Sequence, residues 1–506
     1  MNHWLILPVL VPALIAPLIA LAMRYDIVLA RVFSVASSVL LLILSLILLA
    51  MAGDGEILTY SLGNWASPFG IVLVLDRLSA MLLVLTAVLG LVVLLYSLNG
   101  WDKRGRHFHP IYQFQLMGIN GAFLTGDFFN LFVFFEVLLI ASYGLMVHGG
   151  GAARMRAGVQ YVIVNLVGSS LFLIAVGLIY SVTGTLNMAD LAARVAEVPA
   201  AEQALLRTGA LLLLLVFAIK AALVPVHFWL PGTYAQAPAP VAALFAIMTK
   251  VGAYSIIRMY TLAFGDAAGD LAWLAAPWLL PAALVTLVLG MVGVLAARSL
   301  GQLVSFAVIG SMGTLLAAVA LFTPTAMAAA LYYLLHSTLA AASLFLVVGL
   351  IAERRAAEGD TISVAPRFAQ IGLLASLFFL GAIAMTGMPP LSGFVGKLLI
   401  LEGARDLPQG PWIWTAILAT SLLAIVGFAR AGSTVFWKSG SLDGALRVRR
   451  LMPAGLPLVA VGMLLTGSVA LTVFAGPVHA YLEHTALQIF APSAYVEAVL
   501  GPGWRE

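Results

Sequence analysis

Residues 211–225 read LLLLLVFAIKAALVP, an apolar run in which Lys220 is the only ionisable residue. An ionised side chain at the centre of a bilayer costs about 2.5–3.5 kcal/mol, so a membrane chain keeps one where it faces a polar interior or moves charge. Three further apolar runs each carry one ionisable residue: Glu136 in NLFVFFEVLLIASYG (130–144), Lys250 in VAALFAIMTKVGAY (241–254) and Lys397 in MPPLSGFVGKLLIL (388–401). Together these residues predict ion or proton transfer within a membrane.

Composition predicts the fold class. Of the 506 residues, 63% are hydrophobic and 9% are charged, whereas about a quarter of a soluble domain is charged. The chain is therefore expected to be an all-α polytopic membrane protein with about fourteen membrane-spanning helices. Apolar stretches of about 20 residues predict these helices near residues 4–23, 28–51, 72–97, 109–125, 128–148, 158–182, 208–224, 239–261, 271–296, 301–321, 326–351, 369–404 (interrupted), 411–434 and 454–476.

The basic residues predict the orientation. If the N-terminus lies outside, most of the 25 Lys and Arg residues fall in inner loops, as the positive-inside rule requires. Both termini are therefore expected on the outer face of a bacterial cell membrane, and the net charge of +4 indicates topology rather than nucleic-acid binding. The residues assigned to inner loops are Arg24, Arg31, Lys103, Arg104, Arg106, Arg154, Arg156, Arg298, Arg354, Arg355, Arg367, Arg430, Lys438, Arg447, Arg449 and Arg450.

The sequence lacks the residues that several kinds of chemistry require. The chain has no cysteine, which excludes disulfides and thiolate-ligated metals or iron–sulfur clusters. It contains no phosphate-binding loop or convincing dinucleotide motif, and its histidines lack the spacing of a zinc site. We therefore expect no cofactor, no metal and no catalytic residues, and a transport protein rather than an enzyme.

Prolines interrupt the helical pattern at two places deep in the membrane. The first break follows Lys220 at Pro225, and the second, at Pro389 and Pro390, precedes Lys397. Proline removes a backbone donor, and unpaired backbone groups in a membrane are tolerated where they line a wet cavity or are buried in protein. Broken helices beside ionisable residues predict a transport site, although a packing kink or a surface loop would give the same pattern.

Two polar segments predict surface structure. Residues 52–70 are expected to form an outer turn or hairpin. After Gly476, Tyr481 and Leu482 lie among polar residues and predict an interfacial helix.

Five motifs carry a family resemblance: LDRLSAMLLVL (75–85), DFFNLFVFFEVLLIASYGLMV (127–147), IKAALVPVHFWLPGTYAQAPAPVAALFAIMTKVGAY (219–254), VSFAVIGSMG (304–313) and MTGMPPLSGFVGKLLI (385–400). They resemble the antiporter-like subunits shared by Mrp-type multisubunit monovalent cation/proton antiporters and the membrane arm of respiratory NADH:quinone oxidoreductase. Within this superfamily the chain most resembles the D subunit of the Mrp antiporters.

The resemblance implies an architecture and a set of site residues. It implies N-terminal helices in residues 1–108, two inverted five-helix repeats in 109–261 and 262–434, each with a broken helix, and a last helix with an interfacial segment in 435–506. The family's proton-pathway residues correspond to Glu136, Lys220, Lys250, His336 and Lys397.

Local chemistry supports these roles but leaves alternatives open. A carboxylate near Lys220 would raise the pKa of the lysine and desolvation would lower it, so the distance to Glu136 could control the proton; a static buried ion pair is the alternative. Neighbouring polar residues that could line the path are Asn165, Ser169, Tyr254, Tyr332 and Ser343. Asp76 and Asp127 are read as helix caps.

The resemblance also implies a function and partners. The expected function is proton translocation within a multisubunit Na⁺(or K⁺)/H⁺ antiporter, with large and small hydrophobic subunits as partners in the lipid bilayer. The alternative is a proton-pumping membrane component of NADH:quinone oxidoreductase or of a membrane-bound hydrogenase.

Overall fold

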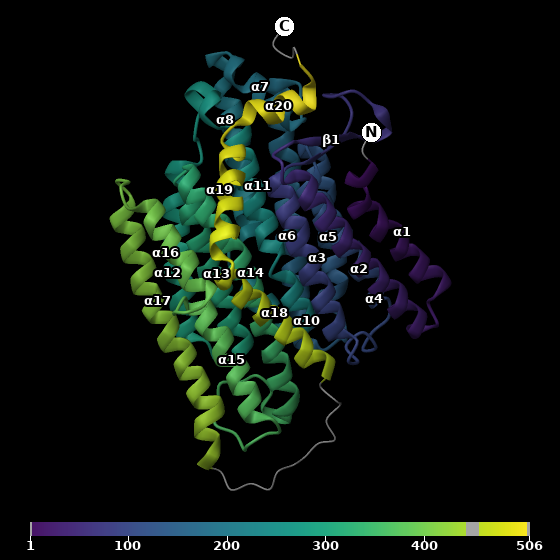
Figure 1. Cartoon of the computed structure of the whole chain (residues 1–506), viewed down its shortest axis with the longest axis vertical. Coiled ribbons are helices and arrows are strands. Elements are labelled where there is room, and N and C mark those ends of the chain that lie inside the picture. The colour runs from purple at the N-terminus through teal and green to yellow at the C-terminus, as the bar shows by residue number, and fades with distance from the viewer. Residues whose placement is uncertain (1–2, 442–454, 503–506) are drawn as a thin grey trace.

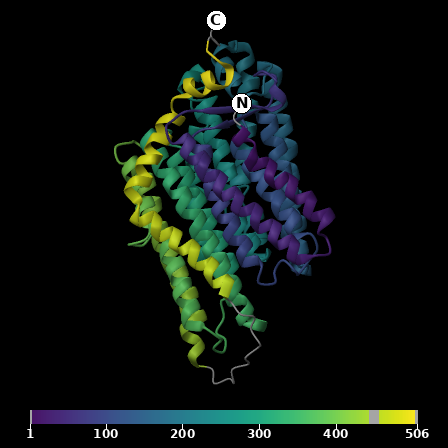
Figure 2. The same ribbon diagram turned by 45° about the vertical axis from the view of Figure 1, so that its right-hand side comes forward.

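The computed structural model describes residues 3–441 and 455–502, and nearly all ordered elements in them are helices. The helices form an elongated bundle, and in both views the two termini lie at the same end (Figures 1 and 2). The described residues include 11 helices long and apolar enough to cross a membrane and two shorter apolar helices, Leu7–Ala22 and Ile371–Thr386. The all-α class is confirmed, while the expected total of fourteen spans stays a prediction.

The N-terminal part contains three helices and a hairpin: α1 (Leu7–Ala22), α2 (Ile27–Ala52), β1 (Leu58–Ser61), β2 (Val72–Leu75) and α3 (Arg77–Ser97). The prediction of one helix over 72–97 is wrong at its start, because Val72–Leu75 pairs antiparallel with β1. A short apolar run rich in valine suits a buried strand as well as a helix. The side chain of Asp76 then accepts from the backbone N–H of Ser79 and caps α3, as expected.

The next part contains three long helices, one short helix and two interrupted helices. Its elements are α4 (Phe108–Leu124), α5 (Phe128–Met146), α6 (Ala152–Thr183), α7 (Met188–Arg194), α8 (Ala200–Ala221), α9 (Trp229–Gln236), α10 (Ala239–Phe245) and α11 (Met248–Leu262). Asp127 caps α5 through the backbone N–H of Asn130. Helices α6 and α8 begin before the predicted 158 and 208, because polar turns with Arg154 and Glu202 extend them beyond their apolar runs.

The remaining elements complete the bundle. They are α12 (Ala276–Ala296), α13 (Leu300–Val319), α14 (Pro324–Arg354), α15 (Ile371–Thr386), α16 (Ser392–Ala404), α17 (Gly410–Gly432), α18 (Gly455–Val473), α19 (Ala475–Ile489) and α20 (Pro492–Leu500). Helix α14 is almost wholly buried and packs against α10, α13, α15, α16, α18 and α19. It is therefore the core element around which the second half is built.

The C-terminal segment packs against the bundle through α19, and the interfacial helix expected from its sequence stays a prediction. Leu482 of α19 is fully buried, and the Tyr481 hydroxyl donates to the carbonyl oxygen of Arg77 at 2.9 Å. Helix α19 thus packs on α14 and α3, and α20 follows it across the end of the bundle (Figure 1). Leu482 therefore contacts protein, whereas Leu487 of the same helix is 57% exposed.

The loops α1–α2 and α3–α4, which carry Arg24, Lys103, Arg104 and Arg106, lie at the end opposite the termini (Figure 1). Arg447, Arg449 and Arg450 lie outside the described residues. Which end faces the cytoplasm stays a prediction.

Candidate functional site

Lys220 lies in the last turn of α8, next to the first helix break. Helix α8 ends at Ala221, and the segment with Pro225 separates it from α9. The lysine side chain is buried, its Nζ donates to Asn165 Oδ1 at 3.1 Å, and the same nitrogen lies 5.8 Å from the ring centroid of Phe135. A neutral amide and an aromatic face therefore contact the ammonium group.

Glu136 lies on α5 beside Lys220 but forms no ion pair with it among the described contacts. Its carboxylate accepts a hydrogen bond from the hydroxyl of Ser169, and its negative charge still acts on Lys220. In this conformation the static buried ion pair considered from sequence is not formed. Asn165 and Ser169 of α6 are instead the hydrogen-bonding partners of the two charged groups.

Lys250 lies near the start of α11, after the short helix α10. Its side chain is fully buried and its Nζ has no hydrogen-bond partner. Helices α11 and α8 are in close contact here: a Cβ on Gly252 would lie 2.7 Å from the backbone nitrogen of Ala221 and 3.0 Å from the carbonyl carbon of Lys220. The lysines therefore belong to adjoining elements with almost no space between their backbones.

His336 lies on α14, fully buried, and faces the second helix break. Its Nδ1 is 2.9 Å from the hydroxyl of Ser392, the first residue of α16, while Nε2 has no partner. The charges of Lys250 and Lys397 both act on His336. His336 therefore lies within electrostatic range of both lysines.

Lys397 lies on α16 and reaches back to the end of α15. Its Nζ donates to the carbonyl oxygen of Thr386 at 2.7 Å and to the hydroxyl of Ser421 at 2.8 Å. Thr386 is the last residue of α15, and Gly387 follows it with a left-handed φ of 79°. The lysine thus caps the negative end of a helix dipole, with no carboxylate partner among the described residues.

The other predicted path-lining residues make bonds elsewhere. The Tyr254 hydroxyl donates to the carbonyl oxygen of Phe123, and the Tyr332 hydroxyl to that of Leu471. The Ser343 hydroxyl donates to the carbonyl oxygen of Ala340 in its own helix. Asn165 and Ser169 therefore contact the buried charged groups. The hydroxyls of Tyr254, Tyr332 and Ser343 donate to backbone carbonyls instead.

Two buried residues near His336 were not predicted from the sequence. Tyr333 and Ser311 are buried, and the Tyr333 hydroxyl faces Ser311 and Thr314 without a hydrogen bond of good geometry; the Tyr333 ring centroid lies 5.6 Å from that of His336. The helical spacing of Tyr333, three residues before His336, places both on one face and could have indicated it. Ser311 lies on α13, and no sequence signal connects it to α14.

The ionisable side chains form a row across five elements of the bundle. From α5, α8, α11, α14 and α16 it comprises Glu136, Lys220, Lys250, His336 and Lys397. Buried polar atoms in proteins are normally satisfied by protein or ordered water, so the unpaired Lys250 Nζ and His336 Nε2 indicate a hydrated row. Lysine and histidine can bind and release a proton, whereas no group of three metal-ligating residues occurs in the described ranges.

Comparisons with known proteins agree with this geometry. Residues 125–425 match the family described as "NADH:quinone oxidoreductase/Mrp antiporter, TM". The chain is 40% identical to the probable K⁺/H⁺ antiporter D subunit of Rhizobium meliloti, covering 99% of this chain and 98% of that protein. It is 39% identical to the Na⁺/H⁺ antiporter D subunit of Bacillus subtilis, covering 99% and 100%.

A solved structure shows the same fold. A chain of the Mrp complex from Dietzia sp. DQ12-45-1b superposes with a TM-score of 0.86 at 28% identity, covering 99% of this chain and 100% of that one. The match to the family spans more than half of the sequence and contains all five ionisable residues of the row. The chain therefore belongs to the family of NADH:quinone oxidoreductase/Mrp antiporter membrane subunits.

Proposed function

We propose that this chain is the D subunit of a multisubunit Na⁺/H⁺ or K⁺/H⁺ antiporter and that it moves protons along the row from Glu136 to Lys397. The observation that carries the proposal is the burial of three lysines and a histidine in one row in which Lys250 and Lys397 have no described carboxylate partner. Uncompensated ionisable groups in a membrane are costly and are kept for function.

The domain arrangement proposed is two inverted repeats, residues 109–261 and 262–434, between N-terminal helices (1–108) and a C-terminal part (435–506). The position of the breaks supports it. With α8/α9, α10/α11 and α15/α16 counted as single interrupted helices and the short helix α7 left out, α8/α9 is the fourth helix of the first set and α15/α16 the fourth of the second. Lys220 and Lys397 lie next to these two equivalent breaks.

The proposed control of Lys220 is electrostatic. When Glu136 approaches, its charge stabilises the ammonium form of Lys220, and when it withdraws, burial favours release of the proton. Asn165 and Ser169 already contact the two groups, so a small movement of either side chain can exchange one partner for the other. A proton released by Lys220 would pass through water to Lys250, His336 and Lys397.

A cavity of about 670 Å³ supports an access route from one side of the membrane. It is lined by the carboxylates Glu353 and Asp360, by side chains of α10 and α14, and by three arginines, Arg104, Arg154 and Arg354. Helix α14 continues to His336, and α10 leads into α11 with Lys250. We assign this cavity as the proton access route from the end opposite the termini.

The coupled cation is proposed to cross a partner protein of the complex. Hard cations prefer carboxylate and carbonyl oxygens, whereas the row offers mainly nitrogen atoms. The partners are then the other large and small hydrophobic subunits of the complex in a bacterial cell membrane, with both termini of this chain outside. Purified alone, the chain should give little exchange.

The test is exchange in everted vesicles that contain the assembled complex but no NADH or quinone substrate. An imposed Na⁺ or K⁺ gradient should drive proton movement, and Lys220→Ala should abolish it while assembly is retained. Proton movement that depends on a redox substrate would instead favour the quinone oxidoreductase or hydrogenase alternative. A dehydrated cation bound at Glu136 in a high-resolution map would contradict the proton-only row.

A further inference from the structure

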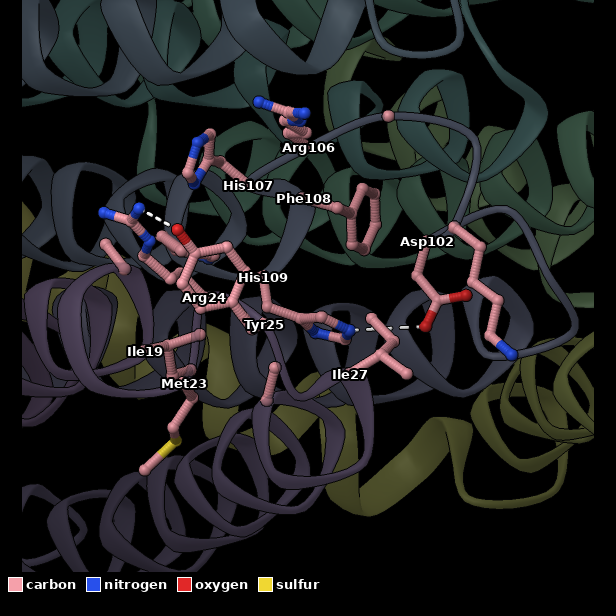
Figure 3. A pocket seen from close by; sticks show the side chains of 15 residues that line it. Ile19, Met23, Arg24, Tyr25, Ile27, Asp102, Arg106, His107, Phe108 and His109 are labelled. Atoms are coloured by element: carbon pink, nitrogen blue, oxygen red, sulfur yellow. Dashed lines mark hydrogen bonds and ion pairs between the residues drawn. The ribbon is translucent and has the colours of Figure 1, made fainter.

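A second cavity, distant from the row of lysines, lies at the end of the bundle opposite the termini. It measures about 550 Å³ and lies between the α1–α2 turn and the α3–α4 loop. One wall is aliphatic, with Ile19, Ala20, Met23, Ile27 and Ala30 from the ends of α1 and α2. The polar wall is formed by the α3–α4 loop, the start of α4 and Arg24 of the α1–α2 turn, and Figure 3 shows these side chains around the cavity.

The polar wall is positively charged. Arg24, Lys103 and Arg106 line it, together with His107 and His109. None of the three permanent cations forms an ion pair with a described residue, although Arg24 lies 4.4 Å from the ring centroid of Tyr25 and donates to its hydroxyl. Three unneutralised cations around one cavity favour an anionic ligand.

Asp102, the carboxylate in the wall, is already neutralised. It accepts from Arg31 at 2.5 and 2.8 Å and lies 3.3 Å from His109 Nε2. Burial raises the pKa of Asp102, but hydrogen bonds from His109 and Arg31 together with their charges outweigh burial and lower it to about 2. The carboxylate therefore remains ionised and bound to its two partners, which leaves the other cations free to meet a ligand.

Two further groups in the wall have no partner. His109 is buried, its Nε2 points to Asp102 (Figure 3), and its Nδ1 has no hydrogen-bond partner. An anion beside Nδ1 could accept a hydrogen bond from this nitrogen. In addition, no side chain caps the N-terminus of α4 after His107, and free amides at a helix N-terminus attract phosphate.

We propose that this cavity binds the phosphate headgroup of an anionic phospholipid. The basic wall and the N-terminus of α4 would hold the phosphate, and the aliphatic wall at the helix ends would hold the first acyl carbons. Basic pockets between membrane helices on one side of a bilayer are suited to such lipids. A soluble phosphate would use the same cations but would gain nothing from the aliphatic wall. The proposal is independent of the proton pathway.

The test uses the assembled complex in nanodiscs that contain phosphatidylglycerol or phosphatidylcholine carrying a photoreactive group near the phosphate. Cross-linked peptides are then identified by mass spectrometry. We expect the anionic probe to label residues 19–30 and 103–110, and the triple variant Arg24→Gln/Lys103→Gln/Arg106→Gln to lose about tenfold of that labelling, since each basic residue at a membrane surface contributes to binding. The matched control Arg156→Gln/Arg298→Gln/Arg367→Gln removes the same number of charges outside the cavity and should be labelled as strongly as the unaltered complex.

Two further measurements separate lipid from soluble phosphate. Ala20→Phe fills the aliphatic wall without changing charge and should reduce labelling, whereas millimolar inorganic phosphate at matched ionic strength should not. Equal labelling by both lipids, no labelling of these peptides, or full labelling of the triple variant would overturn the proposal. Suppression by inorganic phosphate would overturn the assignment to lipid.

Discussion

The two helix breaks hold their lysines in different ways. Lys220 lies before its break, bonds to the amide of Asn165, and is influenced by the nearby carboxylate of Glu136. Lys397 lies after its break and donates to the carbonyl end of α15 and to Ser421. Similar sequence signals thus produce one lysine with a carboxylate nearby that can move and one lysine held by neutral groups.

The difference indicates where control resides. A carboxylate that changes its distance can alter proton affinity by several pKa units, whereas a backbone carbonyl at a helix end cannot move without the helix. We therefore expect Lys220 to be the controlled site and Lys397 a terminal site whose state follows the proton supply from His336.

The largest effect is expected at Lys220. Lys220→Ala should abolish exchange in everted vesicles, because the transferable proton is lost. Lys220→Arg is the deciding variant, since arginine keeps the charge but does not release a proton at working pH. We expect no exchange from it, with assembly of the complex checked in parallel. Near-normal exchange would make Lys220 a structural residue and remove the distinction between the breaks.

The second largest effect is expected at Glu136. Glu136→Ala should abolish exchange, because Lys220 loses its charge partner, and Glu136→Asp should keep part of it, because the charge remains with a shorter reach. The control is Glu402→Ala, whose exposed carboxylate pairs with Arg405 at the surface and whose loss should leave exchange unchanged. If Glu136→Ala remained active, Lys220 would have to be controlled by another group.

Lys397→Met should destabilise the complex more than Lys220→Met does. Methionine keeps most of the side-chain length but leaves the carbonyl of Thr386 and the hydroxyl of Ser421 without their donor, which costs about 1–3 kcal/mol for an unsatisfied buried group. The melting temperature of the complex should fall more for Lys397→Met, which leaves two acceptors without a donor, than for Lys220→Met, which leaves only the Asn165 side-chain oxygen without one. Equal melting temperatures would contradict the capping role of Lys397.

Gly393→Ala tests the close packing at the second break. A Cβ at this position would clash with the carbonyl oxygen of Ala384 and would lie 2.9 Å from His336 Nε2. Overpacking of this kind costs about 1–3 kcal/mol, so we expect a lower melting temperature and reduced exchange. Gly372→Ala, where a Cβ meets nothing within 4 Å, is the matched control and should change neither.

The smallest effect is expected at Tyr332. Its hydroxyl donates to the carbonyl oxygen of Leu471, so Tyr332→Phe should lower stability by about 1 kcal/mol, the typical value of one hydrogen bond, and leave the rate of exchange nearly unchanged. Tyr333→Phe removes the hydroxyl beside His336 and should slow exchange more than Tyr332→Phe does. If Tyr332→Phe slowed exchange more than Tyr333→Phe, Tyr332 would lie on the proton path.

The sequence by itself predicted the helical fold, both helix breaks and the buried ionisable residues. Apolar runs, prolines and charges in lipid are local signals with large free energies, and they do not depend on what packs against them. The caps Asp76 and Asp127 were predictable for the same reason. The family resemblance supplied His336, since one helix histidine carries no strong signal of its own.

The tertiary structure decided everything that depends on which helices meet. It placed Asn165 and Ser169 beside Lys220 and Glu136, turned the hydroxyls of Tyr254 and Tyr332 to distant carbonyls, and added Ser311 and Tyr333 to the row. It also packed α19 on α14 and α3. These contacts join residues far apart in the chain, and hydrogen-bond partners are set by the three-dimensional approach of helices, which no local sequence pattern encodes.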